Sequence, residues 1–163
     1  MLRSIFILGV LLPMSLGSYE LEGVGFIAQK DRFCGPAALA SVMSYHGLAI
    51  DQDTIAQEVY EEKLAGALIT DLENFARSRG FTTRLDRGSV ADIRTFLDEK
   101  TPVIVLVDLG FWVYSRPHYL VVTGYTVDGV IAHTGHEASR RFSTEKFEKI
   151  WHKMGSVYLL VSP

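Results

Sequence analysis

The sequence has a single cysteine, Cys34, so the chain cannot form a disulfide within itself. It has no excess of basic residues either: 16 lysines and arginines stand against 19 aspartates and glutamates, a formal net charge of −3. Domains that bind nucleic acid usually carry a clustered basic surface, so this balance argues against a nucleic-acid partner. There is also no internal repeat, low-complexity tract or nucleotide-binding motif, so any ATP-driven transporter acting with this protein would be a separate chain.

The composition is that of an ordinary globular domain. Hydrophobic residues make up 48% and charged residues 21% of the 163 residues. A chain of this length buries roughly 68–70% of its unfolded surface, so it needs no disulfide or metal to stabilise its core. We therefore expect no cofactor, and a single domain over residues 18–163.

The first 17 residues, MLRSIFILGVLLPMSLG, have the layout of a secretory signal peptide. One basic residue, Arg3, precedes an apolar run over residues 5–12, and Ser15 and Gly17 supply small side chains before a cleavage site. The alternative is a membrane anchor, but the apolar stretch falls well short of the ~20 residues that a spanning helix needs. We predict export to the periplasm or the extracellular space, with residues 1–17 as the signal peptide and no stable membrane span in the mature chain.

Hydrophobic periodicity and turn residues predict helices in the first half of the domain and an antiparallel sheet in the second. Expected helices cover residues 36–46, 51–60, 72–79, 90–99 and 144–151. Expected strands cover residues 81–85, 103–110, 119–127, 130–132 and 156–161. This order indicates an α+β architecture with two lobes and a cleft between them.

Cys34 is the first candidate for chemistry. Gly35 and a proline follow it and open a helix, so the thiol lies at a helix N-terminus. Unpaired N–H groups and the helix dipole lower the pKa of a thiol there, and the thiolate is the nucleophilic form. Gly35 would let a substrate approach the backbone, and Gln29 could donate its amide to an oxyanion. The alternative interpretation is a buried structural cysteine.

His118 is the matching candidate for a base. It stands at the start of the strand HYLVVTGY, where an imidazole can point across a cleft towards a helix terminus. This arrangement predicts an ion pair between Cys34 and His118. Taken alone, His118 would more often be a half-buried structural histidine.

Two segments of the chain resemble a known family. QKDRFCGPAALASVMSYHG, which contains Cys34, and RPHYLVVTGYTVDGVIAHTG, which contains His118, resemble the two halves of the double-glycine leader peptidases. These are papain-like cysteine peptidases at the amino end of bacteriocin-exporting transporters, and they also occur as separate exported proteins. The resemblance covers residues 27–161 and implies a papain-like two-lobed fold. It also implies that Cys34 is the nucleophile, His118 the base and Gln29 the oxyanion donor.

The sequence departs from this family at the third triad position. The family places Asp or Asn at the end of the second hairpin strand, where this chain reads VIAHTG. Matching the strand puts His133 at that position, and counting back from the last helix puts Thr134 there. Either could accept a hydrogen bond from His118, although less well than a carboxylate. Asp108 is a remoter candidate and more plausibly a turn residue at a strand end.

The remaining signals are weaker. His133 and His136 together with His118 suggest a metal site, but no further cysteine or acidic cluster stands near them. The aromatic run over residues 111–114 could line a peptide groove or simply pack in a loop.

Three functions follow from these residues. The first is an exported cysteine peptidase acting on a peptide or protein substrate. The second is a catalytically weak or inactive peptide-binding module of the same fold. The third is a thiol-based redox or metal sensor, which a lone cysteine without a resolving partner makes the least favoured.

Overall fold

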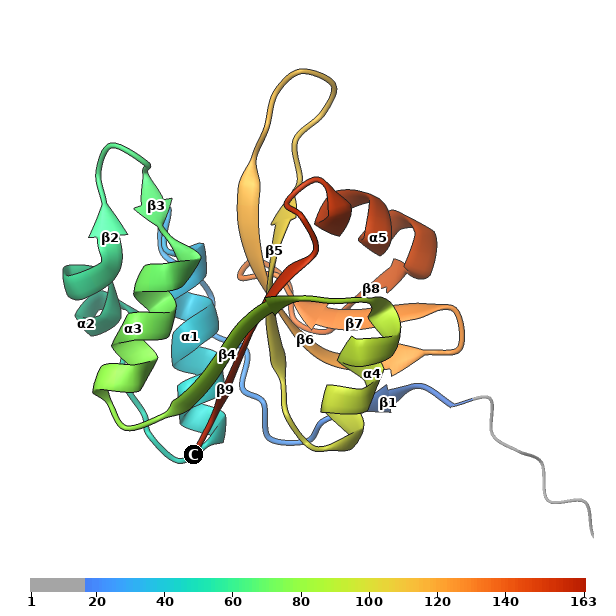
Figure 1. The fold of residues 1–163 in the computed structure, drawn as a ribbon, viewed down its shortest axis with the longest axis horizontal. Coiled ribbons are helices and arrows are strands. Elements are labelled where there is room, and N and C mark those ends of the chain that lie inside the picture. The colour runs from blue at the N-terminus through green and yellow to red at the C-terminus, as the bar shows by residue number, and fades with distance from the viewer. Residues whose placement is uncertain (1–16) are drawn as a thin grey trace, which may run out of the picture.

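The computed structural model describes residues 17–163 (Figure 1). All but the last residue of the predicted signal peptide lies outside the described residues. Within residues 17–163, no helix is both long enough and apolar enough to cross a membrane.

The helices agree with the predicted ones in number and approximate position. They are α1 (Cys34–Tyr45), α2 (Gln52–Val59), α3 (Ile69–Ser78), α4 (Val90–Asp98) and α5 (Thr144–His152). The predicted strands correspond to β4 (Thr82–Arg87), β5 (Val103–Asp108), β6 (Pro117–Thr126), β7 (Gly129–His133) and β9 (Val157–Ser162). Four short strands were not predicted: β1 (Tyr19–Glu20), β2 (Tyr60–Glu61), β3 (Gly66–Ala67) and β8 (Arg140–Ser143).

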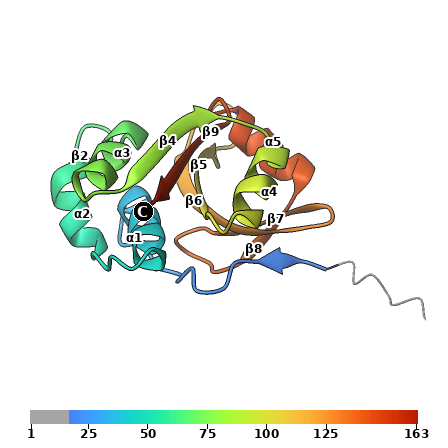
Figure 2. The ribbon, with the colours of Figure 1, turned by 60° about the horizontal axis from the view of Figure 1, so that its bottom comes forward.

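One antiparallel sheet organises the fold. Its strands follow the order β4-β9-β5-β6-β7-β8, and β1 adds to β6. Both Figure 1 and Figure 2 show α1, α2 and α3 on one side and α4, α5, β7 and β8 on the other, with β4 and β9 crossing between them. The predicted α+β class and two-lobed arrangement are confirmed.

The central helix α1 is buried along most of its length. Residues 35–43 are all buried, and the helix packs against β6. Its small alanine side chains allow this close packing, and Gly47 follows its end with a positive φ of 91°, a conformation that glycine adopts without steric cost. The helix therefore fixes Cys34, its first residue, against the sheet.

One predicted helix start was wrong. The sequence from Thr70 to Glu73 looks like a capping box, but α3 already begins at Ile69. The Glu73 carboxylate instead accepts hydrogen bonds from Arg77, at 2.7 Å, and from Thr83 in β4, at 3.0 Å. The Glu73 side chain therefore contacts Arg77 and Thr83 instead of capping the helix as the local sequence pattern predicts.

Two other local predictions had different outcomes. The capping box formed by Ser89 and Asp92 at the start of α4 is confirmed, with both reciprocal hydrogen bonds present. The strands expected over residues 119–127 and 130–132 place a turn at Asp128 and Gly129, but the turn lies one residue earlier, because Gly129 already pairs with Thr126. Residue 129 needs to be glycine because a Cβ there would collide with the carbonyl of Phe142 in β8.

Candidate active site

Cys34 is half-buried at the first position of α1. N–H groups in the first turn of a helix have no partner within the helix, and here those of Cys34 and Gly35 face the sulfur. The backbone N–H of Tyr119, in β6, also interacts with the sulfur. The fold therefore holds the thiol against the residue that directly follows His118.

Gly35 has a different role from the one expected. The sequence suggested that its missing side chain leaves space for substrate. In the structure Gly35 is buried, and a Cβ there would lie 3.2 Å from the Tyr119 ring and from Leu72. Gly35 therefore lets α1 pack closely on β6 and α3, and it is not open to a ligand.

His118 is held by a main-chain carbonyl. Its imidazole is only 5% exposed, and Nε2 lies 2.6 Å from the carbonyl oxygen of Thr134. A carbonyl oxygen only accepts, so Nε2 must carry the hydrogen and donate it. In the neutral ring the lone pair then lies on Nδ1, which makes no hydrogen bond with any residue of the described chain. His118 is thus fixed in the tautomer that leaves Nδ1 ready to accept a proton.

The turn after β7 fixes the direction of this carbonyl. The Thr134 hydroxyl accepts from the N–H of Glu137 at 2.9 Å, and the Thr134 N–H donates to the Glu137 carbonyl at 3.0 Å. Hydroxyl side chains commonly stabilise tight turns in this way. The Thr134 side chain therefore shapes the turn, while its carbonyl contacts the histidine.

His133 does not take the orienting place expected for it. Its Nδ1 accepts from the N–H of Ser139 at 3.0 Å, so the hydrogen of the neutral ring is on Nε2, which lies 2.9 Å from the Val24 carbonyl. Both ring nitrogens are used, and neither faces His118. Of the two candidate positions it is Thr134, directly after the end of β7, that contacts His118, and it does so through its main-chain carbonyl.

Gln29 comes close to this same turn. Its backbone N–H donates to the Gly135 carbonyl at 2.9 Å. Its side-chain Oε1 is buried beside Gly135 without a hydrogen-bond donor, and a Cβ on Gly135 would collide with it. Gly135 has a φ of +80° and lines the same small pocket as Cys34. Two consecutive carbonyls, of Thr134 and Gly135, therefore hold the histidine and the loop that carries Gln29.

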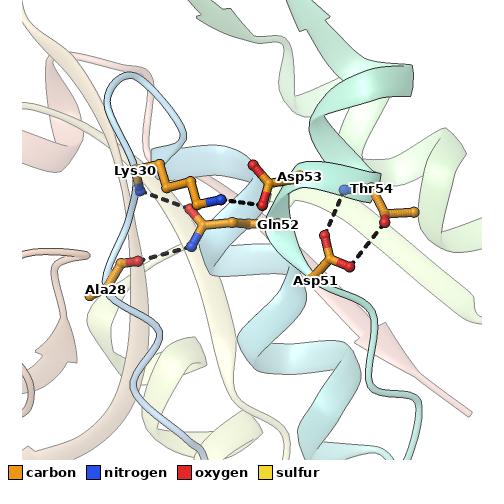
Figure 3. Close-up of polar contacts among 6 residues, drawn as sticks. All are labelled: Ala28, Lys30, Asp51, Gln52, Asp53 and Thr54. Atoms are coloured by element: carbon orange, nitrogen blue, oxygen red, sulfur yellow. Dashed lines mark hydrogen bonds and ion pairs between the residues drawn. The ribbon is translucent and has the colours of Figure 1, made fainter.

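A residue that the sequence analysis missed clamps this loop. Gln52 is buried at the first position of α2 and binds the backbone on both sides of Gln29 (Figure 3). Its Oε1 accepts from the Lys30 N–H at 2.8 Å, and its Nε2 donates to the Ala28 carbonyl at 2.9 Å. The loop and the helix are over twenty residues apart in sequence, so no local pattern pointed to this contact.

The start of α2 is itself well anchored. Asp51 caps the helix by accepting from the backbone N–H of Thr54 at 2.8 Å, and Asp53 forms an ion pair with Lys30 (Figure 3). An N-cap side chain stabilises the first turn of a helix. The first turn of α2, which carries Gln52, is therefore stabilised where it contacts the Gln29 loop.

Comparison with known proteins assigns the family. A family model described as "Peptidase_C39 like family" matches residues 21–159. The chain belongs to the C39-like peptidase family. The resemblance to double-glycine leader peptidases that the sequence suggested is thereby confirmed. No protein of curated function matches the chain in sequence.

Solved structures of this family share the fold. The peptidase domain of Streptococcus ComA, a bi-functional ABC transporter involved in a quorum sensing pathway, is 26% identical, with a TM-score of 0.72 over 86% of this chain and 98% of that domain. A putative C39-like peptidase from Bacillus anthracis is 18% identical, with a TM-score of 0.74 over 90% and 98%. A double glycine motif protease from an AMS/PCAT transporter, in complex with the leader peptide, is 17% identical, with a TM-score of 0.71 over 88% and 94%.

Two other predicted candidates take no part in the site of this C39-like chain. Asp108 accepts from the N–H groups of Gly110 and Arg116, both at 2.7 Å, and from the Ser115 hydroxyl at 3.1 Å. It is a turn residue at the end of β5, as its sequence context favoured. No group of three or more His, Cys, Asp or Glu side chains within residues 17–163 is arranged to hold a metal ion.

Burial determines the protonation of the site in this C39-like protein. It raises the pKa of the Cys34 thiol above the ordinary 9.0, because desolvation outweighs the stabilising N–H groups. Burial also lowers the pKa of His118 below the ordinary 6.5, although the Thr134 carbonyl opposes this, and nearby His136 lowers it further. Both shifts favour the neutral thiol and the neutral imidazole over the expected ion pair, which stays a prediction.

Alkylation of Cys34 tests this protonation state. A thiol reacts as thiolate, and a raised pKa reduces the thiolate fraction at every pH below it. The rate of reaction with iodoacetamide is therefore expected to rise with pH through a midpoint above 9.0. The urea-unfolded chain, in which the same thiol is solvated, should react faster at neutral pH. Rapid labelling of the folded protein below pH 7 would instead indicate the ion pair.

Proposed function

We propose that this protein is an exported cysteine peptidase in which Cys34 is the nucleophile and His118 the general base and acid. The observation that carries the proposal is the tautomer of His118. Donation from Nε2 to the Thr134 carbonyl leaves the lone pair on Nδ1. The Cys34 sulfur lies beside the backbone N–H of Tyr119, the residue after this histidine, which supports pairing the two groups.

The first half of the reaction forms an acyl-enzyme. His118 Nδ1 takes the thiol proton as the Cys34 sulfur attacks the carbonyl carbon of the substrate peptide bond. The negative charge that develops on the carbonyl oxygen is held by the N–H of Cys34 and the side-chain amide of Gln29. The carbon–nitrogen bond then breaks, the proton on Nδ1 passes to the leaving amine, and a thioester remains on Cys34.

Hydrolysis of the thioester completes the cycle. His118 Nδ1 takes a proton from water, the resulting hydroxide adds to the thioester carbonyl, and the carbon–sulfur bond breaks. The sulfur leaves as thiolate and takes the proton back from His118, which restores the neutral pair. The Thr134 carbonyl stabilises the imidazolium in both halves, with less electrostatic gain than a carboxylate would give.

Export is the part of the proposal that rests on sequence alone. It draws on the signal-peptide layout of residues 1–17. The ComA and AMS/PCAT relatives act in transporters, as their names state. A peptide or protein on the outer side of the membrane would be the substrate here.

A cleavage assay with a single variant tests the activity. Residues 18–163 are incubated with a peptide library, and the products are identified by mass spectrometry. The wild-type protein is expected to produce cleaved peptides and an acyl adduct on the thiol, whereas Cys34→Ser should produce neither. Equal product patterns from both proteins would refute the proposal. Peptide binding by both without cleavage would identify the chain as a binding module, the second function that the missing triad carboxylate suggests.

A further inference from the structure

A cavity of about 730 Å³ adjoins the base of the proposed site. It lies between α5 and the loop that joins β5 to β6, and His118 and Thr134 contribute to its wall. This loop projects beyond the rest of the described chain at the top of Figure 1, with α5 beside it. The mechanism above uses only the His118 end of this cavity, so most of its surface has no assigned role.

One wall of the cavity is apolar and exposed. Phe111 and Trp112 line it and are 86% and 87% exposed, although large aromatic side chains normally contact other groups. Trp112 has a positive φ of 56°, a conformation that costs free energy for a residue with a side chain. Phe142 and Ile150 add further apolar lining. Contiguous exposed apolar surface of this kind marks a site that contacts another molecule.

The opposite wall is cationic. Lys146, Lys149 and Lys153 all line the cavity. The spacing of three residues places Lys146 and Lys149 on one face of α5, and Lys153 is the C-cap residue that directly follows the helix. None of the three forms an ion pair with an acidic side chain within residues 17–163. Glu145 and Glu148, on the same helix, are not among the lining residues.

The described lining of the cavity contains one acidic side chain, and that side chain is paired with an arginine. Glu137 is the acidic residue among the described lining residues, and its carboxylate pairs with Arg140 at 3.7 Å. The cavity therefore combines an aromatic wall with three lysines that lack an ion-pair partner, of which Lys153 donates a hydrogen bond to the Gly110 carbonyl at 3.3 Å. The net charge of the protein as a whole is negative. The charge of the cavity complements an anionic ligand, and its apolar wall requires that the same ligand carry hydrophobic groups.

We propose that this cavity is a substrate subsite for an extended peptide segment in which acidic and apolar side chains alternate, and that Lys146, Lys149 and Lys153 determine this specificity. The inference rests on the proposed peptidase function, because the cavity reaches the reaction centre through His118. The segment lies on one side of the scissile bond, with carboxylates towards α5 and apolar side chains towards Phe111 and Trp112. An extended strand suits this division, because its side chains alternate between two faces.

A binding experiment tests the subsite without catalysis. The Cys34→Ser protein is titrated against a fluorescein-labelled peptide that alternates glutamate with leucine and phenylalanine, and against the same peptide with glutamine in place of glutamate. The glutamate peptide is expected to bind more tightly, with an advantage that shrinks as salt is added. Each substitution of Lys146, Lys149 or Lys153 by glutamine should weaken its binding by about two- to fivefold, with little effect on the glutamine peptide.

A matched control separates local from overall charge. Lys149→Glu and Lys63→Glu change the net charge equally, but Lys63 lies in the turn between β2 and β3, outside the cavity. Lys149→Glu should weaken binding of the glutamate peptide by about tenfold, and Lys63→Glu by less than twofold, since a distant exposed charge is screened. Equal effects of the two variants would overturn the proposal. Equally tight binding of a labelled oligonucleotide would also overturn it, because the cavity would then be a general anion site.

Cleavage of the same two peptides distinguishes this inference from the function on which it rests. If wild-type protein cleaves both peptides equally, the peptidase stands and the subsite is wrong. If the glutamate peptide binds selectively and wild-type protein leaves it intact, the subsite stands and the peptidase is wrong for this sequence. If wild-type protein cleaves the glutamate peptide faster than the glutamine peptide, and Lys149→Glu removes this difference, both the peptidase and the subsite are supported.

Discussion

Replacing His118 by alanine is expected to lower kcat/KM for peptide cleavage by about 10²–10⁴-fold, the range contributed by a positioned acid–base group. The loss arises because Cys34 starts as a neutral thiol with a raised pKa and therefore needs a base at Nδ1. The leaving amine loses its proton donor in the same variant. Peptide cleavage followed by mass spectrometry or fluorescence measures the effect.

The pH dependence of activity and a control variant distinguish the loss of the His118 base from a general loss of activity. The neutral pair is the reactive form, so wild-type activity should fall as pH drops through the lowered pKa of His118, below 6.5. The acid limb should disappear in His118→Ala. His152→Ala, at the exposed end of α5, removes an imidazole far from the thiol and should leave activity unchanged. Retention of more than a tenth of the activity in His118→Ala would rule out the assigned role.

Replacing Gln52 by leucine is expected to reduce kcat by about 10–100-fold, because small displacements of a group that stabilises the transition state are costly. Gln52 contacts neither the thiol nor the histidine. It holds the backbone on both sides of Gln29, and leucine can make neither hydrogen bond. KM and the acid limb of the pH profile should change little, since His118 is untouched.

Stability gives a second measurement on the same variant. Leucine leaves the Lys30 N–H and the Ala28 carbonyl without their partner, which should lower the free energy of unfolding by about 1–3 kcal/mol. Gln57→Leu is the matched control, because Gln57 lies exposed on the same helix. If the two variants lose kcat equally, Gln52 is not a positioning residue. If Gln52→Leu loses stability alone, its role is confined to the fold.

Short sequence signals predicted the helices and the longer strands of this protein well. Proline and alanine after Cys34 placed the thiol at the start of a helix, and Ser89 with Asp92 marked the start of α4. These signals act over a few residues, so the sequence displays them directly. The pairing of Cys34 with His118 was predicted from the types of the two residues and their places in a helix start and a strand start, and the family resemblance added support.

The predictions that failed depend on tertiary structure. The side on which His133 lies, and the path of the turn at Thr134, are set by the register of β7 against β6. The pKa of Cys34 also depends on tertiary structure, because burial raises it while the N–H groups at the helix N-terminus lower it as expected. The Gln52 clamp joins segments that meet only in the folded chain.

The contact between the Thr134 carbonyl and His118 affects which substitutions this site can accept during evolution. Every amino acid supplies a main-chain oxygen, so the acceptor for the imidazole does not require an acidic side chain at position 134, whose hydroxyl acts on the turn instead. What must be inherited is the path of the backbone, which the glycine at position 135 and its positive φ help to define. A search pattern that demands Asp or Asn at the third position would pass over this chain, although its histidine is oriented all the same.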